Sequence, residues 1–229
     1  MKNNNSLEAE IEDIVKSFSP VKNNRTSSEE LKRIKKYSND NLNLISLKLK
    51  TLDEEEKRNI IVNLIAALDY YIHEIIIWGI IQITLNKFPE TKKYGKLEIS
   101  IKYLKEFKEK DIFDDPKLKI AIIEKLRKNT YQKWEDIKEG LDFVIPKDFH
   151  KKIGELASEG KFQVAELKKI NDKRNFIVHH FDREYKEKSL RNKFDIDCEK
   201  SFELIKFIID SIHKIVEDYD NTQPENKEQ

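Results

Sequence analysis

The side chains best suited to chemistry gather in residues 168–184, KKINDKRNFIVHHFDRE. Arg174 and Asn175 stand next to each other there, and His179 follows Asn175 at i+4, so on a helix the two are neighbours. A histidine exchanges protons near neutral pH, and an arginine offers a planar, permanently charged fork to an anion. The segment therefore holds a proton-transfer group and a cation. The alternative interpretation is a buried structural arginine with a hydrogen-bonded histidine.

Arg174 occupies a position at which the helical pattern calls for an apolar residue. The row is otherwise apolar, at Leu167, Ile170, Ile177, Val178 and Phe181. An unpaired guanidinium facing a core costs about 3–5 kcal/mol, so Arg174 needs a carboxylate partner or a cleft. Asp69 is the candidate partner, with His73 at i+4 beside it in LDYYIHE as a supporting residue. The alternatives are that Asp69 reaches solvent and that His73 is a satisfied border histidine.

The elements that must position these residues are all expected to be helices. Asp53 and Glu56 form a D-x-x-E capping box, and the helical period that follows over 54–87 predicts the core helix. Further helices are expected over residues 7–18, 28–38, 96–110, 116–138, 162–182 and 197–219, with a looser stretch around 142–160. No segment alternates like a strand, so the predicted fold class is all-α, a helical bundle.

Three parts are expected along the chain. Residues 1–50 are polar and interrupted, which predicts a partly helical N-terminal extension that packs on the main domain or on a regulatory protein partner. Residues 51–220 form the helical bundle. Residues 221–229 have the composition of a disordered tail.

Composition and charge exclude several classes of protein. The 229 residues carry 44 basic and 43 acidic side chains, so the net charge of +1 gives no global attraction to nucleic acid or membranes. Only ten residues are Gly or Pro, too few turn-formers for a many-stranded β-fold. The single Cys198 allows no internal disulfide. Without a signal-like start, and with its longest uncharged stretch at 75–86, the chain is expected to be soluble and cytoplasmic, with no membrane contact.

Nucleotide-binding and metal-binding motifs are absent from the sequence. It holds no G-x-G-x-x-G, no G-x-x-x-x-G-K-[ST] and no H-E-x-x-H. A metal site built from Asp69, His73 and His179 is geometrically conceivable, but the prediction is no metal and no cofactor.

The segment RNFIVH at 174–179 resembles the R-(polar)-x-x-x-H signature of HEPN ribonucleases, all-helical domains of toxin–antitoxin, CRISPR-effector and phage-defence systems. The motif lies in the penultimate predicted helix and has Asn second. ALDYYIHE, in the long early helix, resembles the RiboL-PSP type of HEPN domain. The resemblance covers roughly residues 51–219. One departure is Phe181, which stands where some HEPN toxins carry a tyrosine that their antitoxin modifies with AMP, so regulation of that kind is not expected.

The resemblance implies an endoribonuclease that needs no metal, with RNA as substrate, acting as a toxin or phage-defence effector. Arg174 and His179 would be the chemical pair and Asn175 their support, whereas His180 is not expected to be essential. A homodimer, or pairing with another HEPN chain, is also implied. Two alternatives stay open: a catalytically silent HEPN module that binds RNA or nucleotide or dimerises within a defence complex, and a helical adaptor that holds a partner through residues 1–50.

Overall fold

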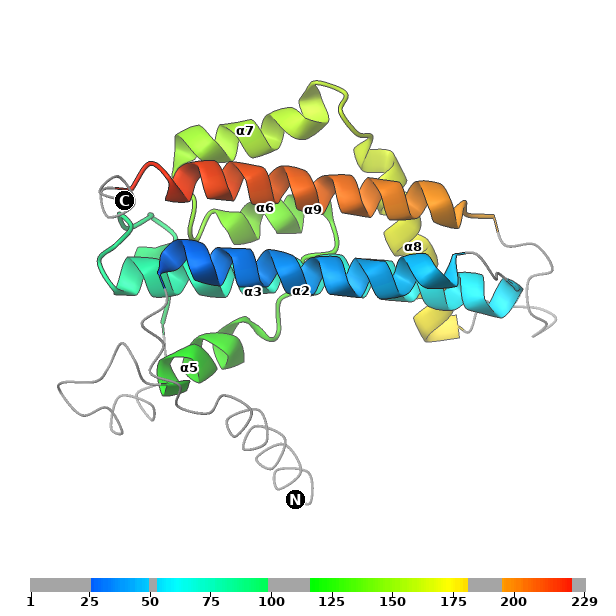
Figure 1. Ribbon diagram of the computed structural model, residues 1–229, viewed down its shortest axis with the longest axis horizontal. Helices are drawn as coiled ribbons and strands as arrows, with labels where there is room; N and C mark the ends of the chain where they lie inside the picture. Colours follow the sequence, from blue (N-terminus) through cyan, green and yellow to red (C-terminus); the bar gives the residue numbers. More distant parts are fainter. Residues whose placement is uncertain (1–25, 50–52, 99–115, 181–194, 224–229) are drawn as a thin grey trace, which may run out of the picture. The chain divides into compact units, whose positions relative to one another are not determined.

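A computed structural model describes residues 26–49, 53–98, 116–180 and 195–223, and within these ranges every regular element is a helix (Figure 1). The all-α prediction is confirmed. The helices are α2 (Ser27–Lys48), α3 (Glu54–Thr84), α5 (Pro116–Leu126), α6 (Trp134–Leu141), α7 (Lys147–Ser158), α8 (Val164–His180) and α9 (Cys198–Asp220), with the short 3₁₀ helix η1 (Tyr94–Lys96).

The chain divides into two compact units. One comprises Ser27–Leu97 and Asn129–Gln229, and the other comprises Met1–Thr26 and Glu98–Lys128. The described helix of the second unit, α5, begins at Pro116, as expected for a proline at the first helical position. All the remaining helices belong to the first unit, which is called the bundle below.

The core helix of the bundle is α3. Its first turn carries the expected capping box: the backbone N–H of Glu56 donates to Asp53 Oδ1 at 2.7 Å, and the Asp53 N–H donates to Glu56 Oε2 at 3.4 Å. Seventeen of its 31 residues are buried, because α2, α6, α8 and α9 all pack against it. By length and composition α3 is also apolar enough to cross a membrane, but 61% of its most apolar window is buried in the protein.

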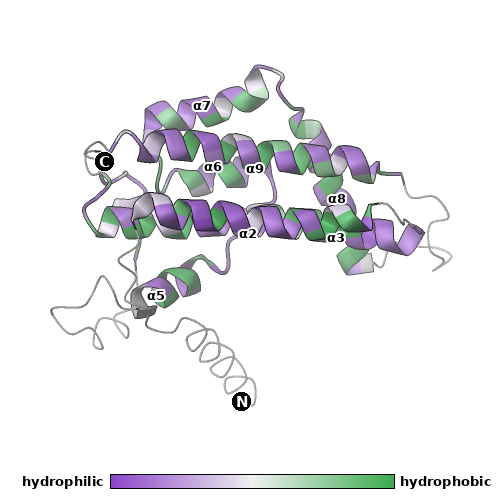
Figure 2. Cartoon of the chain, in the orientation of Figure 1, coloured by the Kyte–Doolittle hydropathy of each residue, from purple (hydrophilic) through white to green (hydrophobic). Residues whose placement is uncertain are grey.

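Helix α2 is an integral part of the bundle, which moves the boundary expected at residue 50 to residue 26. It runs ten residues further than predicted and buries Leu31, Ile34, Leu42 and Ile45. The first residue of α2 contacts the C-terminal end of α9, where Ser27 Oγ donates to Asp220 Oδ1 at 2.7 Å. Figure 2 shows hydrophilic residues over much of the side of α2 that faces the viewer, as expected for an amphipathic helix at the surface.

The prediction of a single helix over 116–138 is wrong. The chain leaves α5 at Leu126 and begins α6 at Trp134, because Tyr131 and Trp134 are both buried in the bundle and the connection bends to place them there. The stretch around 142–160, expected to be loose, contains α7 after Pro146. The helix predicted over 7–18, most of that over 96–110 and most of the C-terminal tail lie outside the described residues.

At Gly79, helix α3 closely approaches the turn after α6. A Cβ at residue 79 would lie 2.4 Å from Val144 Cβ, inside the van der Waals limit. We expect Gly79→Ala to lower the free energy of unfolding by about 1–3 kcal/mol through overpacking, despite the better helix propensity of alanine. Urea unfolding measures the change. The matched control is Gly154→Ala in α7, where a Cβ meets nothing within 4 Å and the same substitution should stabilise the protein. Equal effects of the two substitutions would contradict the close approach.

Candidate functional site

The candidate catalytic residues lie at the C-terminal end of α8, where burial fades along the helix. Leu167 and Ile170, in its first half, are 1% and 3% exposed. No residue from 174 to 179 is buried to that extent, Val178 is 43% exposed, and His179 is exposed. Figure 1 shows the last turns of α8 emerging beyond α3 on the side away from α9, which explains why the apolar residues there are less well covered.

Arg174 sits half-buried at this point of the helix. Its Nη1 donates to Asn175 Oδ1 at 2.9 Å, while its Nε is buried with no hydrogen-bond partner. Leaving a buried donor unpaired costs about 1–3 kcal/mol. The residue type at position 174 is therefore not explained by stability alone.

Asp69 and His73 contact Tyr131 instead of the motif. Asp69 Oδ1 accepts a hydrogen bond from the backbone N–H of Tyr131, and the His73 ring meets the Tyr131 ring edge-on at a centroid distance of 4.6 Å. Across the part of the chain that the structure describes, no ion pair joins Asp69 to Arg174. The expected pairing is therefore not formed, because the carboxylate fixes the connection that precedes α6.

These contacts predict the effect of replacing Asp69. We expect Asp69→Ala to lower the free energy of unfolding by about 1–3 kcal/mol, since it leaves the Tyr131 N–H unpaired. Asp69→Asn, which keeps an acceptor oxygen, should stay close to wild type. In urea unfolding, the effects of Asp69→Ala and Arg174→Met should add. A coupling energy of more than about 1 kcal/mol between the two substitutions would instead indicate the ion pair between Asp69 and Arg174 that the sequence predicted.

The buried cation of α8 is Lys173, which the sequence pattern did not single out. Its side chain is 6% exposed, and its Nζ lies 3.1 Å from Asp195 Oδ1 in the segment before α9. Partial burial works against ionisation of Asp195, but the hydrogen bond and the charge of Lys173, together with smaller contributions from the Asp195 backbone and Lys169, outweigh it and hold the pKa of this carboxyl below its usual value. The sequence did contain a signal for the burial of Lys173, because it follows the apolar residues Leu167 and Ile170 at i+6 and i+3 on the same side of the helix. Lys173 therefore ties α8 to the chain entering α9.

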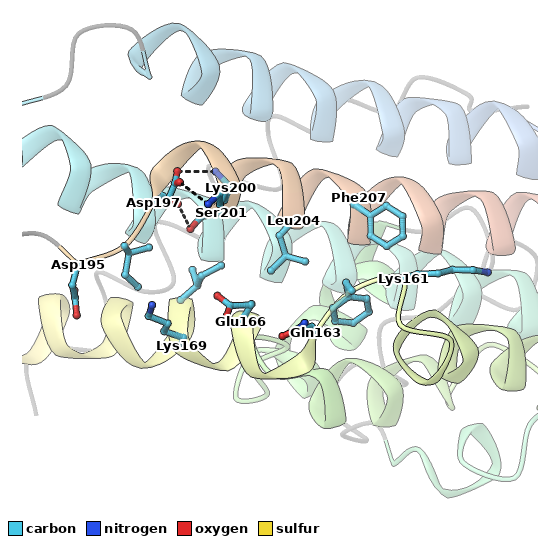
Figure 3. Close-up of a pocket in the computed structure, with 13 residues that line it drawn as sticks. Lys161, Gln163, Glu166, Lys169, Asp195, Asp197, Lys200, Ser201, Leu204 and Phe207 are labelled. Carbon is cyan, nitrogen blue, oxygen red and sulfur yellow. Dashed lines mark hydrogen bonds and ion pairs between the residues drawn. The ribbon is translucent and has the colours of Figure 1, made fainter.

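A groove of about 480 Å³ lies between α8 and α9, as Figure 3 shows. Its lining is apolar at Phe162 and Phe207 and carries charges of both signs. Two of its three acidic side chains already have structural roles. Asp195 binds Lys173, and Asp197 caps α9 by accepting from the Lys200 N–H at 3.0 Å. Neither Arg174 nor His179 lines the groove. The motif and the groove are therefore separate features of α8.

The described ranges contain no group of three or more His, Cys, Asp or Glu side chains arranged to hold a metal ion. Asp69, His73 and His179 are thus not gathered into the metal site considered above. Cys198 is buried, and burial raises its thiol pKa to about 11, which keeps the thiol protonated at neutral pH. A thiolate nucleophile at this position is not supported.

Comparison with known proteins returns no relative of this chain. No protein family, no curated protein and no solved structure matches it. The residues of the chain and their geometry are therefore the basis on which a function is assigned.

Proposed function

We propose that this protein is a metal-independent endoribonuclease of the HEPN type, with Arg174 and His179 as its chemical pair. The observation that carries the proposal is the end of α8, where a half-buried arginine with an unpaired Nε, its partner Asn175 and an exposed histidine lie within six residues. The resemblance of this segment to the HEPN signature assigns the same residues to RNA cleavage.

The proposed reaction uses the substrate's own hydroxyl group as nucleophile. The 2′-OH of one nucleotide attacks the adjacent phosphorus, and the bond to the 5′-oxygen of the next nucleotide breaks. Two protons move in this step, one away from the attacking hydroxyl and one to the leaving 5′-oxygen; His179 carries out one of these transfers and water carries out the other. Arg174 stabilises the charge on the phosphate oxygens, and Asn175 holds the guanidinium through its Oδ1. The products are a 2′,3′-cyclic phosphate and a 5′-OH.

A second copy of the chain completes the site in this proposal. Five residues turn about 500° on a helix, so Arg174 and His179 of one copy point about 140° apart. Two copies related by a two-fold axis can bring both motifs to one phosphate. The incomplete burial of residues 174–179 supports such an arrangement. A role as a toxin or phage-defence effector in the cytoplasm belongs to the same proposal, because it follows from the HEPN resemblance.

End-group analysis tests the reaction. The full chain is incubated with a defined RNA oligonucleotide and with its DNA counterpart, both in EDTA. We expect cleaved RNA with 2′,3′-cyclic phosphate (or the monophosphate to which it opens) and 5′-OH ends, and intact DNA, because DNA lacks the attacking hydroxyl. A 5′-phosphate product or a requirement for a divalent ion would overturn the mechanism.

A catalytically silent HEPN module is the second candidate, favoured by two observations. Arg174 already donates to Asn175, and the motif lies outside the groove between α8 and α9. Under this alternative the chain retains RNA in a filter-binding assay without cutting it. Absence of cleavage under all conditions, with RNA retained, would replace the first proposal by this one.

A further inference from the structure

A buried asparagine precedes Arg174 on α8. Asn171 is 1% exposed, and its Oδ1 is buried with no hydrogen-bond partner. It follows the buried Leu167 at i+4, on the side of α8 that packs in the bundle. An apolar side chain would fill this position without leaving an acceptor unpaired, so packing alone does not explain the asparagine.

The unpaired atoms of Asn171 and Arg174 are complementary. Among the described residues of α8, two side-chain atoms are buried without a hydrogen-bond partner, the acceptor Asn171 Oδ1 and the donor Arg174 Nε. The two residues stand at i and i+3, so they are neighbours on one face of the helix. A helical side chain leans toward the N-terminus of its helix, which directs Arg174 toward the turn that holds Asn171. Each residue therefore carries the group that the other lacks.

A rotation of the Asn171 amide brings the two atoms together. The last side-chain torsion of asparagine has broad minima, so the amide turns within its site at little cost. Arg174 is already held at Nη1, which donates to Asn175 Oδ1 at 2.9 Å. A guanidinium has five N–H donors, so two amides that accept one each leave three for a ligand.

The amide side chain suits a cation that must keep its charge. An asparagine oxygen holds a guanidinium without neutralising it, whereas a carboxylate offsets the positive charge. The adjacent cation Lys173 has such a carboxylate, since its Nζ lies 3.1 Å from Asp195 Oδ1. In the ranges that the structure describes, Arg174 forms no ion pair and is bound by an amide instead. Its environment is therefore that of a cation that binds an anion, and that of Lys173 is structural.

We propose that Asn171 is a positioning residue, whose Oδ1 accepts the Nε–H of Arg174 and, together with Asn175, fixes the plane of the guanidinium. A planar fork makes two parallel bonds to a phosphate only when its plane is aligned with the phosphate oxygens, and two contacts restrict that plane more than one. The contact between the two side chains depends on α8 alone. Its use in RNA cleavage rests on the proposed function.

Nitrogen-15 NMR of the full chain without RNA tests the contact. The Nε–H resonance of Arg174 is identified by its loss in Arg174→Lys. We expect Asn171→Ala to speed exchange of this proton with water by about tenfold, because the acceptor is removed. The matched control is Gln82→Ala near the end of α3, which removes another buried amide oxygen without a partner and should leave the exchange unchanged. Equal exchange in wild type and Asn171→Ala, or an equal rise in both variants, would overturn the contact.

A second variant keeps this test decisive if Asn171→Ala fails to fold. Asn171→Asp retains an acceptor oxygen at the same place, so the Nε–H of Arg174 should exchange as slowly as in wild type. Fast exchange in Asn171→Asp would contradict the contact.

Cleavage of an RNA oligonucleotide in EDTA tests the role in the reaction. Asn171→Ala should lower the rate at saturating RNA by about tenfold and change the RNA concentration that gives half the maximal rate by less than about twofold, because RNA still binds but the guanidinium is less well aligned. In an Arg174→Lys background the same substitution should have no further effect, since lysine has no Nε–H to hold. A loss of equal size in both backgrounds would show that Asn171 acts through the fold alone.

The outcomes separate this inference from the proposed function. Nε–H exchange that depends on Asn171, in a chain that never cleaves RNA, would retain the contact and remove the ribonuclease. RNA cleavage that Asn171→Ala leaves unaffected would retain the ribonuclease and remove Asn171 from its site.

Discussion

Replacing His179 by alanine is expected to lower the rate of RNA cleavage in EDTA by roughly 100- to 10,000-fold, the usual loss when a general acid–base histidine is removed. The substitution should leave the fold intact, because His179 is exposed at the end of α8 and closes no buried contact. The measurement is a single-turnover rate on a fluorescent RNA oligonucleotide, beside a circular dichroism melt.

The neighbouring histidine provides the matched control for this prediction. His180→Ala makes the same chemical change one residue later in α8 and should retain most of the activity. Arg174→Lys should be strongly impaired, since a point charge cannot reproduce the planar fork of the guanidinium. Full activity in His179→Ala, or an equal loss in His180→Ala, would remove His179 from the mechanism.

Acidification is expected to destabilise the bundle through His213 of α9. This histidine is 7% exposed, and its Nδ1 is buried without a hydrogen-bond partner. Burial lowers its pKa to about 4, Lys35 of α2 adds to the lowering, and Asp210 opposes it. Unfolding returns the pKa to about 6.5. The unfolded chain therefore binds a proton more readily, and about 3 kcal/mol of stability should be lost between pH 6.5 and pH 4.

Urea unfolding at several pH values checks this loss, with His213→Leu as the comparison. The variant has no imidazole to protonate, so its stability should vary much less than that of wild type between pH 6.5 and pH 4. Hydrogen bonds from Lys206 and Lys35 outweigh the opposing effect of burial and hold the pKa of Asp210 below its usual value, so this carboxyl titrates at lower pH. Parallel pH profiles of the two proteins would contradict this prediction, because they would mean that the pKa of His213 is the same in the folded and the unfolded state.

The sequence by itself determined the features that depend on local pattern. The capping box at Asp53 and Glu56 and the apolar period after it defined α3, because hydrogen bonds at a helix start and one-sided burial are set by residues a few positions apart. The same holds for α9, which was expected over 197–219 and begins at Cys198 after the side chain of Asp197 caps it. The sequence also identified Arg174, Asn175 and His179 as side chains suited to chemistry on one helix.

The tertiary structure decided which long-range partner each polar side chain has. The sequence allowed Asp69 to pair with Arg174. In the structure, the connection that precedes α6 places the backbone N–H of Tyr131 against Asp69, and the carboxylate accepts its hydrogen bond. The helical period predicted that Arg174 lies in the row of residues that faces the core. Because α8 runs past α3 at this point, Arg174 is only half-buried, and Lys173 is the deeply buried cation.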